Sequence, residues 1–162
     1  MKIAVTLNVN GTDHPVQVEA RRTLADAIRE DCGQTGTHLG CEHGVCGACT
    51  ILLDGEPVRS CLLFAVQAAG RKIRTVEGLA VRTSEGEKLH PLQRAFIEHH
   101  GLQCGYCTPG FLMLAAGTLE RNPDIGDAEL NEVLSSNLCR CTGYKNIVEA
   151  VRAAATEMRA RR

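Results

Sequence analysis

The sequence contains few aromatic residues and no tryptophan, so any hydrophobic core must be built mainly from aliphatic side chains. Of its 162 residues, two are Tyr and three are Phe. Hydrophobic residues make up 44% of the chain and charged residues 23%, which is an ordinary balance for a globular protein. A chain of this length accommodates one domain or two small ones.

An excess of charge and a long apolar segment are also missing. The formal net charge is −1, so we do not expect a nucleic-acid-binding protein, which a strongly basic chain would indicate. The longest apolar run, GFLMLAAG at residues 110–117, is far shorter than the roughly 20 residues of a membrane-spanning helix. The N-terminal segment lacks the apolar stretch of a secretory signal. We therefore expect a cytoplasmic protein without a membrane span.

Cysteine is the residue in excess, with nine in the chain. Thiols in the cytoplasm stay reduced unless they bind a metal, so the cysteines predict metal sites rather than disulfides. The sequence offers no Ser-His-Asp set, phosphate loop or paired acid and base. We therefore expect a chain that carries electrons and does no bond chemistry itself.

Four of these cysteines have the spacing of a known iron–sulfur site. Cys41, Cys46 and Cys49 lie in the segment GCEHGVCGACT, and Cys61 follows after eleven residues. This is the plant-type ferredoxin spacing for a 2Fe–2S cluster. The glycines at 40, 44 and 47 would let the backbone adopt positive φ and approach the sulfurs without a Cβ clash. Backbone N–H groups would then offset the negative charge of the cluster.

Two other kinds of metal site fit this segment poorly. Structural zinc sites pair cysteines two to four residues apart and place a second pair much later in the chain. Rieske centres replace two of the cysteines by histidines. His43 lies inside the segment, but four cysteines are already present. We interpret His43 as a partly exposed loop residue.

A second set of four cysteines lies in the C-terminal half. Cys104 and Cys107 belong to QCGYCTPG, and Cys139 and Cys141 belong to NLCRCTGY. A Cys-x2-Cys pair is also a common half of a zinc site, so zinc stays an alternative here. The single residue between the last two cysteines suits a one-ion tetrahedral site less well, and the ferredoxin-like spacing upstream favours a second 2Fe–2S cluster.

The positions of two of these cysteines relative to helices are also informative. Cys107 comes just before a helix predicted to start at Thr108-Pro109, and Cys141 before one near Asn146. Helix N-termini favour negative charge, and a cluster with four thiolate ligands is anionic. The helices would therefore ease electron acceptance.

Two further features are interpreted as structural. Cys32, the ninth cysteine, fits neither set, and we expect a buried or half-buried thiol at the end of a helix. The pair His99-His100 before Gly101 is interpreted as a solvated helix end rather than a metal site.

The first part of the chain predicts a small mixed sheet crossed by one helix. Two β-rich runs flank Asn10-Gly11, and two more flank Asp54-Gly55, which are strong hairpin signals. A helix is expected from Thr23, the N-cap, with Asp26 at the capping-box position. RKIRTVEG at residues 71–78 predicts one more short strand.

The second part of the chain predicts helices. The polar stretch at residues 78–90 is typical of a linker. Helical periodicity follows in four segments, with Thr108 as an expected N-cap and with Leu130, Val133, Leu134 and Leu138 on one apolar face. The last helix has Ile147, Val151, Ala154 and Met158 on its apolar face. Four short helices with tight connections predict a compact bundle.

Both cysteine segments together resemble the small iron–sulfur subunits of the molybdenum hydroxylases, the xanthine oxidase and aerobic carbon monoxide dehydrogenase family. The likeness rests on GCEHGVCGACT, QCGYCTPG and NLCRCTGY and covers nearly the whole chain. It implies an α+β fold, with an N-terminal β-grasp ferredoxin domain at residues 1–77. A C-terminal four-helix-bundle 2Fe–2S domain would occupy residues 78–162.

The resemblance also implies cofactors and partners. The ligands would be Cys41, Cys46, Cys49 and Cys61 for one cluster and Cys104, Cys107, Cys139 and Cys141 for the other. Gln103 would hydrogen-bond the pterin of the molybdenum cofactor, and Cys141 would lie beside its amino group. That cofactor, molybdopterin cytosine dinucleotide, would sit in a large subunit and FAD in a medium one, in an (LMS)2 assembly.

The implied function is one-electron transfer from molybdenum through the two clusters to FAD or another acceptor. Carbon monoxide, aldehydes, aromatic N-heterocycles and aryl-CoA thioesters are all substrates of such complexes, and the sequence does not choose among them. A free-standing ferredoxin shuttle and a zinc-stabilised scaffold are the alternatives. The helical part argues against a shuttle, which needs one exposed cluster.

Overall fold

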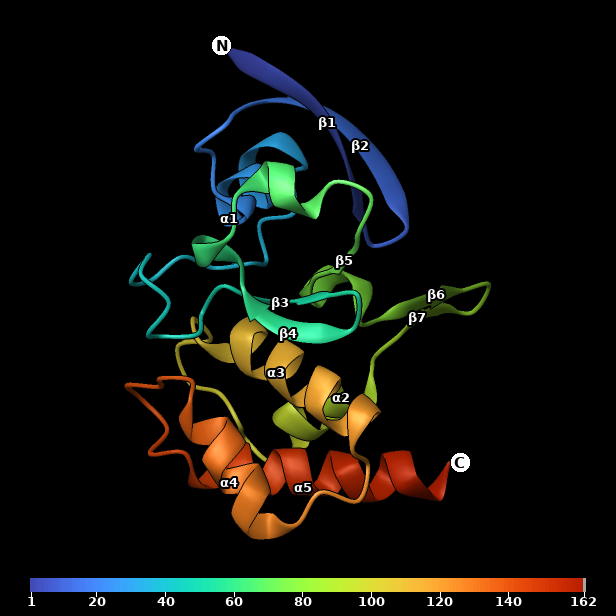
Figure 1. The fold of residues 1–162 in the computed structure, drawn as a ribbon. Helices are drawn as coiled ribbons and strands as arrows, with labels where there is room; N and C mark the ends of the chain where they lie inside the picture. Colours follow the sequence, from blue (N-terminus) through green and yellow to red (C-terminus); the bar gives the residue numbers. More distant parts are fainter. Residues whose placement is uncertain (162) are drawn as a thin grey trace.

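The computed structural model describes residues 1–161, and of Arg82 it describes the backbone alone. Figure 1 shows a sheet with a short helix at the N-terminal end of the molecule and a group of longer helices at the other. The loops at residues 40–49 and 136–144, which carry cysteines, lie on the same side of the molecule (Figure 1).

Five strands form a mixed sheet in the order β2-β1-β5-β3-β4. They are β1 (Lys2–Val9), β2 (Thr12–Glu19), β3 (Thr50–Leu53), β4 (Glu56–Arg59) and β5 (Lys72–Arg74). β1 and β5 run parallel, and the other neighbours are antiparallel. Both predicted hairpins and the last predicted strand are confirmed. Each hairpin turn has two residues with positive φ, Asn10-Gly11 and Asp54-Gly55, as the right-handed twist of paired strands requires.

The helix predicted after the first hairpin forms with an unexpected winding. α1 (Leu24–Asp26) continues as a π-helical turn, η1 (Ala27–Asp31). Thr23 is the N-cap as predicted, since its Oγ1 accepts the backbone N–H of Asp26 at 3.1 Å. The capping box is altered, because Asp26 accepts the Thr23 hydroxyl at 2.7 Å instead of reaching the backbone.

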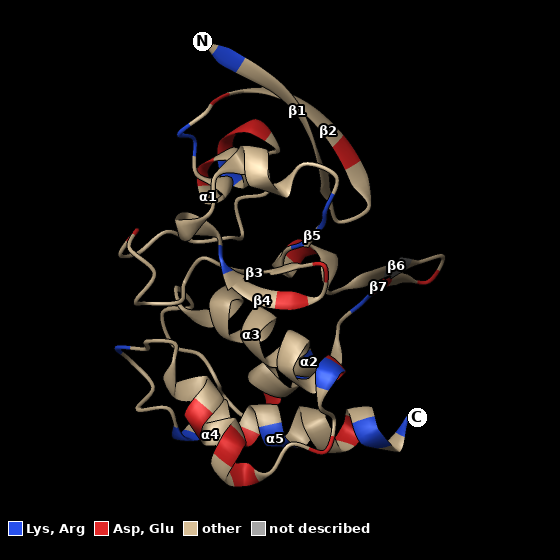
Figure 2. Cartoon of the chain, viewed as in Figure 1, with Lys and Arg blue, Asp and Glu red and all other residues tan. Residues whose placement is uncertain are grey.

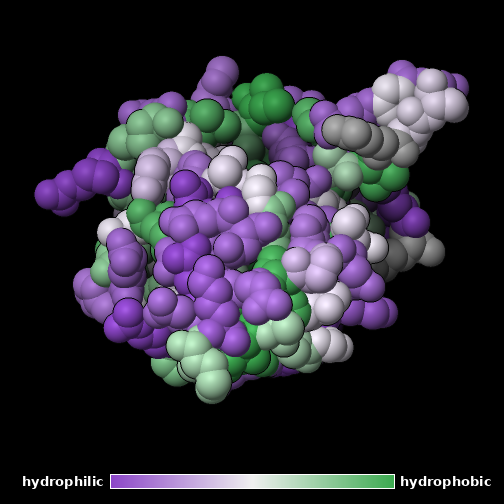
Figure 3. Space-filling view, turned by 90° about the horizontal axis from the view of Figure 1, so that it is seen from above, coloured by the Kyte–Doolittle hydropathy of each residue, from purple (hydrophilic) through white to green (hydrophobic). Residues whose placement is uncertain are grey.

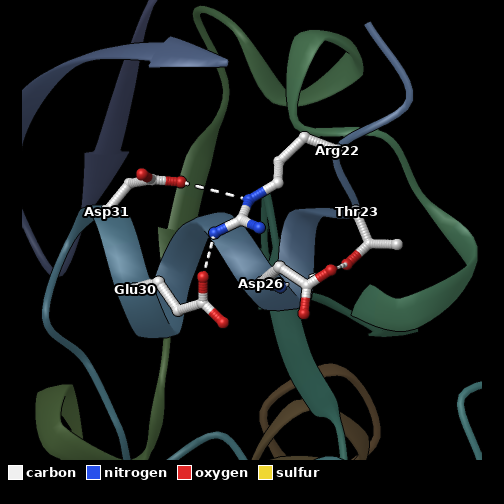
Figure 4. A network of polar contacts seen from close by, with 5 residues as sticks. All are labelled: Arg22, Thr23, Asp26, Glu30 and Asp31. Carbon is white, nitrogen blue, oxygen red and sulfur yellow. Dashed lines mark hydrogen bonds and ion pairs between the residues drawn. The ribbon is translucent and has the colours of Figure 1, made fainter. Parts of the chain in front are cut away.

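An ion-pair network holds this helical segment against the chain that enters it. The Arg22 guanidinium binds Glu30 and also Asp31, with 3.4 Å between Nε and Oδ2 (Figure 4). The hydrogen bond with Glu30 is the largest reason why the pKa of Arg22 is raised. The π-helical end is thereby tied to the residue that precedes the N-cap.

The stretch predicted as a linker contains a hairpin that the sequence did not reveal. β6 (Val81–Thr83) and β7 (Gly86–Lys88) pair antiparallel as a separate small sheet, after the short helices η2 (Ser60–Leu62), η3 (Ala65–Ala68) and η4 (Val76–Gly78). The Thr83 hydroxyl closes the turn by donating to Gly86 O at 2.8 Å. The linker prediction was wrong here, because an exposed polar hairpin has no hydrophobic alternation to signal it.

Four helices form the C-terminal part, as predicted. They are α2 (Pro91–Glu98), α3 (Thr108–Arg121), α4 (Asp127–Ser135) and α5 (Lys145–Ala160). Two details of the prediction were wrong. Cys107, not Thr108, is the N-cap of α3, and Leu138 lies beyond α4 with 51% of its surface exposed.

Strand β3 connects the two hydrophobic cores. Ile51 and Leu53 face the α1–η1 side of the sheet and pack with Leu7, Ile28 and Ile73. The side chain between them, Leu52, points to the other face and joins the helical core of Phe111, Leu119 and their neighbours. Side chains alternate across a strand, so β3 packs against a different core on each face. The molecule therefore has three layers: the α1–η1 helix, the sheet and the helical bundle.

The surface shows no strong separation of charge. Acidic and basic residues are interspersed along the chain in Figure 2, and the net charge is −1. Seen from the N-terminal end, the surface is hydrophilic at its centre (Figure 3). Within residues 1–161, every helix is too short or too polar to cross a lipid bilayer.

Gly110 allows α3 to meet the loop between Cys46 and Cys49. A Cβ at Gly110 would lie 2.3 Å from the carbonyl oxygen of Gly47 and 3.1 Å from Ala48 Cα. We predict that Gly110→Ser lowers the free energy of unfolding by roughly 1–3 kcal/mol, because backbone must move to relieve the overlap. Urea denaturation of the cluster-loaded protein measures this change.

Gly126→Ser provides the matched control. A Cβ at Gly126 meets no atom within 4 Å among the described residues, and the residue is the N-cap of α4, where serine is favoured. This variant should match or slightly exceed the parent stability. Equal denaturation midpoints for the two serine variants would contradict the packing argument.

Candidate metal centres

The first four predicted ligands lie together, and we call them the N-terminal thiol set: Cys41, Cys46, Cys49 and Cys61. Cys41 and Cys46 belong to one loop, and the Cys46 N–H donates to Cys41 Sγ at 3.3 Å. Cys49 directly precedes β3, while Cys61 lies in η2, and their thiols contact each other. The hairpin β3–β4 thus returns the chain from Cys49 to Cys61, and the set meets as two pairs.

The two ends of this set differ in electrostatics. Backbone N–H groups of Cys46 and then His43 lower the pKa of Cys41 to about 6. Burial, and next the contact with Cys49, raise the pKa of Cys61 to about 12. The thiolate form is therefore stabilised at Cys41. At the other end of the set, the sulfurs of Cys49 and Cys61 lie close together in an apolar environment. Four thiolates this close need a positive charge to offset their repulsion, which iron supplies.

The glycines of the loop act much as predicted. Gly44 and Gly47 have φ of 84° and 75°. Gly40 is not in this positive-φ region, but a Cβ there would lie 3.0 Å from Cys46 Sγ. His43 was expected to be partly exposed, and the structure places it in the exposed class. Its ring also contacts Cys41 O through Nδ1 at 2.5 Å.

The other four predicted ligands form the C-terminal thiol set: Cys104, Cys107, Cys139 and Cys141. Cys107 contacts Cys139, and Cys104 contacts Cys141, so this set also meets as two pairs. Cys107 is the N-cap of α3, where the helix dipole favours negative charge. α5 begins at Lys145, so Cys141 lies shortly before a helix start, as predicted.

The C-terminal set combines a buried and an exposed side. Burial, and next the contact with Cys139, raise the pKa of Cys107 to about 12. For Cys139 burial acts in the same direction, but hydrogen bonds from Thr142 outweigh it and the pKa is lowered. Cys104 and Cys141 are exposed, and so is Gln103 beside them. The exposed sulfurs place this set at the surface.

The paired arrangement fits a two-iron cluster. A 2Fe–2S cluster is held by four thiolates, with two on each iron, and each set offers two contacting pairs. Among residues 1–161, no three Cys, His, Asp or Glu side chains converge on the position of one ion. The donors present therefore suit a 2Fe–2S cluster in each set.

A backbone hydrogen bond links the two sets. The carbonyl oxygen of Cys46 accepts the N–H of Leu138 at 2.9 Å, and Leu138 directly precedes Cys139. Asn137 Nδ2 also donates to Gly47 O at 3.3 Å. A Cβ on Gly47 would lie 2.0 Å from Asn137 Oδ1, so only glycine allows the two loops to approach this closely.

Arg59 reinforces the same junction from β4. It donates through Nη1 to Thr50 Oγ1 at 2.5 Å and through Nη2 to Ser136 O at 2.9 Å. Thr50 in turn donates to Gly47 O at 2.6 Å. One guanidinium therefore connects the residue after Cys49 with the segment before Cys139.

A ring stack connects the loops on their outer side. His38 and Tyr106 stack with 4.7 Å between ring centroids. His38 Nδ1 contacts Tyr106 O at 2.8 Å, and the Tyr106 hydroxyl donates to Leu39 O at 2.5 Å. Sequence reasoning missed these contacts, because residues 67 to 68 positions apart carry no shared spacing signal.

The comparisons with known proteins agree with this geometry. A family model described as a 2Fe-2S iron-sulfur cluster binding domain matches residues 7–80. A second, described as a 2Fe-2S binding domain, matches residues 75–152. Together the two models span both thiol sets.

Relatives of known function match over nearly their full length. The chain is 59% identical to the nicotine 6-hydroxylase small subunit of Paenarthrobacter nicotinovorans, covering 93% of this chain and 88% of that one. It is 54% identical to caffeine dehydrogenase subunit gamma of Pseudomonas sp. strain CBB1, covering 91% and 88%. A chain of quinoline 2-oxidoreductase from Pseudomonas putida 86 superposes with a TM-score of 0.89 at 52% identity, covering 98% and 97%. This chain belongs to the small iron–sulfur subunits of the molybdenum hydroxylases.

Membership of this family settles several predictions. The protein is a non-catalytic electron-transfer subunit of an oxidoreductase complex, and it carries two 2Fe–2S clusters. It is not a free-standing ferredoxin, and the zinc alternative is likewise overturned. The printed names of the relatives describe them as subunits of larger oxidoreductases.

Replacing one cysteine separates the two clusters. We predict that Cys107→Ser removes one of two electron paramagnetic resonance signals and halves the iron content, because the C-terminal set loses a buried donor. The N-terminal signal should remain, since its thiols lie in a different core. Spectra of the dithionite-reduced subunit and iron analysis measure both effects.

Cys32→Ala is the control for this substitution. Cys32 is buried, and burial is the main reason why its pKa is raised to about 11. Both signals should persist in this variant. If Cys107→Ser loses both signals while Cys32→Ala keeps both, the cysteines of the two sets would belong to a single metal site.

Proposed function

We propose that each thiol set holds one 2Fe–2S cluster and that electrons pass singly from the C-terminal set to the N-terminal set. They would enter from the molybdenum cofactor of one partner subunit and leave to FAD of another. The observation that carries this proposal is the hydrogen bond from Leu138 N to Cys46 O. It joins Leu138, the neighbour of the predicted ligand Cys139, to the predicted ligand Cys46, so that the route between the two cysteines consists of covalent bonds and one hydrogen bond.

The same proposal assigns the parts of the chain. The ferredoxin-like part would span residues 1–77 and the helical part residues 78–162. The two family models support this division, since they meet at residues 75–80. The burial pattern supports it too, because the first core draws on residues up to Ile73 and the second is mostly helical.

The exposed side of the C-terminal set would face the pterin. Cys104 and Cys141 are exposed in this chain, and Gln103 beside them is exposed as well. An amide can both donate to and accept from the polar edge of a pterin. We propose Gln103 and Cys141 as the residues that contact the molybdopterin cytosine dinucleotide of the large subunit.

Two groups of exposed hydrophobic residues support two separate partners. The N-terminal apolar rim consists of Val45, Leu62 and Phe64, exposed by 57%, 61% and 47%. The C-terminal apolar rim consists of Leu102, Tyr106 and Leu138, exposed by 37%, 51% and 51%. Each rim adjoins one thiol set, and exposed apolar patches mark interaction sites. We assign the first rim to a medium FAD subunit and the second to the large subunit, in an (LMS)2 complex of the cytoplasm.

The relatives favour one class of substrate for the complex. Nicotine, caffeine and quinoline, which are all nitrogen heterocycles, appear in the names of relatives that are 52–59% identical. The aldehyde oxidoreductase subunit of Escherichia coli O157:H7 is 40% identical. We propose that the complex hydroxylates an aromatic N-heterocycle.

Purification of the native complex tests this assignment. We predict that the tagged chain co-elutes with two larger chains, molybdenum and FAD, and that nicotine-like or purine-like heterocycles bleach the flavin absorbance. Benzaldehyde serves as the competing substrate. Elution of the chain alone would refute the subunit proposal, and reduction by the aldehyde alone would refute the substrate class.

A charge on the N-terminal apolar rim tests the acceptor surface. Leu62→Glu should weaken binding of the FAD subunit at least tenfold, because a carboxylate would have to be desolvated in the interface. Val81→Glu is the matched control, since Val81 is equally exposed at 61% but lies on the β6–β7 hairpin. Titration of the isolated FAD subunit by light scattering measures the affinity. If both variants lose affinity for the FAD subunit equally, or if neither loses affinity, Leu62 does not lie in the interface.

A further inference from the structure

Three hydrogen bonds form a closed ring beside the C-terminal thiol set. The Cys139 N–H donates to the Tyr144 hydroxyl at 3.1 Å. The Tyr144 N–H donates to Thr142 Oγ1 at 3.1 Å, and Thr142 Oγ1 lies 3.1 Å from Cys139 Sγ. The ring therefore returns to the cysteine from which it starts.

The ring fixes the direction of the Thr142 hydroxyl. A backbone N–H can only donate, so Thr142 Oγ1 must accept the bond from Tyr144. The hydroxyl proton is then free to point at Cys139 Sγ, which as a thiolate can only accept. The Thr142 N–H also lies 3.5 Å from this sulfur. One sulfur atom thus faces two donors from the same residue.

The backbone accepts strain to form the ring. Tyr144 has φ 69° and ψ −27°, a left-handed conformation, at the N-cap of α5. A bulky side chain at positive φ is unusual, and such strain persists only where its surroundings enforce it. Two contacts hold Tyr144 in place. Its hydroxyl accepts the hydrogen bond from the Cys139 N–H, and its aromatic ring contacts the Phe111 ring edge-on, with 6.3 Å between the ring centroids.

We propose that Thr142, positioned by Tyr144, raises the reduction potential of the cluster held by the C-terminal thiol set. Reduction adds one electron to the cluster and makes its thiolate sulfurs more negative. A hydroxyl proton aimed at Cys139 Sγ stabilises this added charge, so the reduced form gains more than the oxidised form. The inference rests on the ligand assignment made under the proposed function.

The effect is confined to one cluster. In the N-terminal thiol set, Cys41 Sγ accepts from the backbone N–H groups of Cys46 and His43. No hydroxyl donor to a sulfur of that set is found within residues 1–161. Thr142 therefore sets the C-terminal potential independently, and with it the driving force for electrons to enter the chain.

Redox titration of the isolated, cluster-loaded subunit, followed by electron paramagnetic resonance, tests this inference. Thr142→Val keeps the shape of the side chain and the backbone donor but removes the hydroxyl. At a fixed potential, we expect the ratio of reduced to oxidised C-terminal cluster to fall about tenfold, which is ~59 mV for one electron. The N-terminal potential should not change.

Two variants distinguish hydrogen bonding from a general effect of mutation. Thr142→Ser keeps the hydroxyl and should retain the parent potential. Thr108→Val removes a buried hydroxyl beside Cys107 that has no hydrogen-bond partner among residues 1–161, and it should leave the potential unchanged.

The possible outcomes separate this inference from the proposed function. An unchanged C-terminal potential in Thr142→Val, or equal shifts in Thr142→Val and Thr108→Val, would overturn the role of Thr142 while both signals remain. Absence of a second signal in the parent protein would instead overturn the ligand assignment on which the inference rests.

Discussion

The structure depends on keeping four cysteine sulfurs together at two places in one small chain. Thiolates repel one another, and burial disfavours them further, as the pKa values near 12 for Cys61 and Cys107 show. Iron offsets this repulsion, so binding of the clusters is coupled to folding. The protein then needs only to hold each loop in the right shape. It does so with glycines at positive φ, backbone N–H groups and short hairpin or helix connections.

The distance between the two sets is controlled by a compact junction. Gly47 lies between the Gly110 turn of α3 and the side chain of Asn137, and no larger residue fits there. Arg59 and the hydrogen bond between Leu138 and Cys46 hold the same interface. The junction thus serves two purposes at once, because the contacts that pack the helical bundle on the sheet also bring the cluster ligands close. With the proposed ligands, electron transfer and domain packing would therefore depend on the same few residues.

Features that depend on neighbouring residues could be predicted from the sequence. The Cys-x4-Cys-x2-Cys spacing, the Asn-Gly and Asp-Gly turns, and the periodic apolar faces of the helices are local signals, and the structure agrees with them. The β6–β7 hairpin was missed because its described side chains are exposed and show no alternation of apolar and polar residues. Leu138 was placed on a helix face because its spacing continues that of α4, but the chain leaves the helix to contact Cys46. The His38–Tyr106 stack and the Arg59 contacts join distant segments, so spacing alone does not reveal them. The Thr142–Tyr144 ring is local, yet it needs a left-handed tyrosine that propensity rules disfavour.

The most direct test of the account is spin quantitation of the dithionite-reduced, fully loaded subunit by electron paramagnetic resonance. Two 2Fe–2S clusters joined through the Cys46–Leu138 hydrogen bond predict two distinct signals that integrate to two spins per chain and broaden each other at low temperature. A single signal of one spin per chain, together with zinc in the metal analysis, would contradict it.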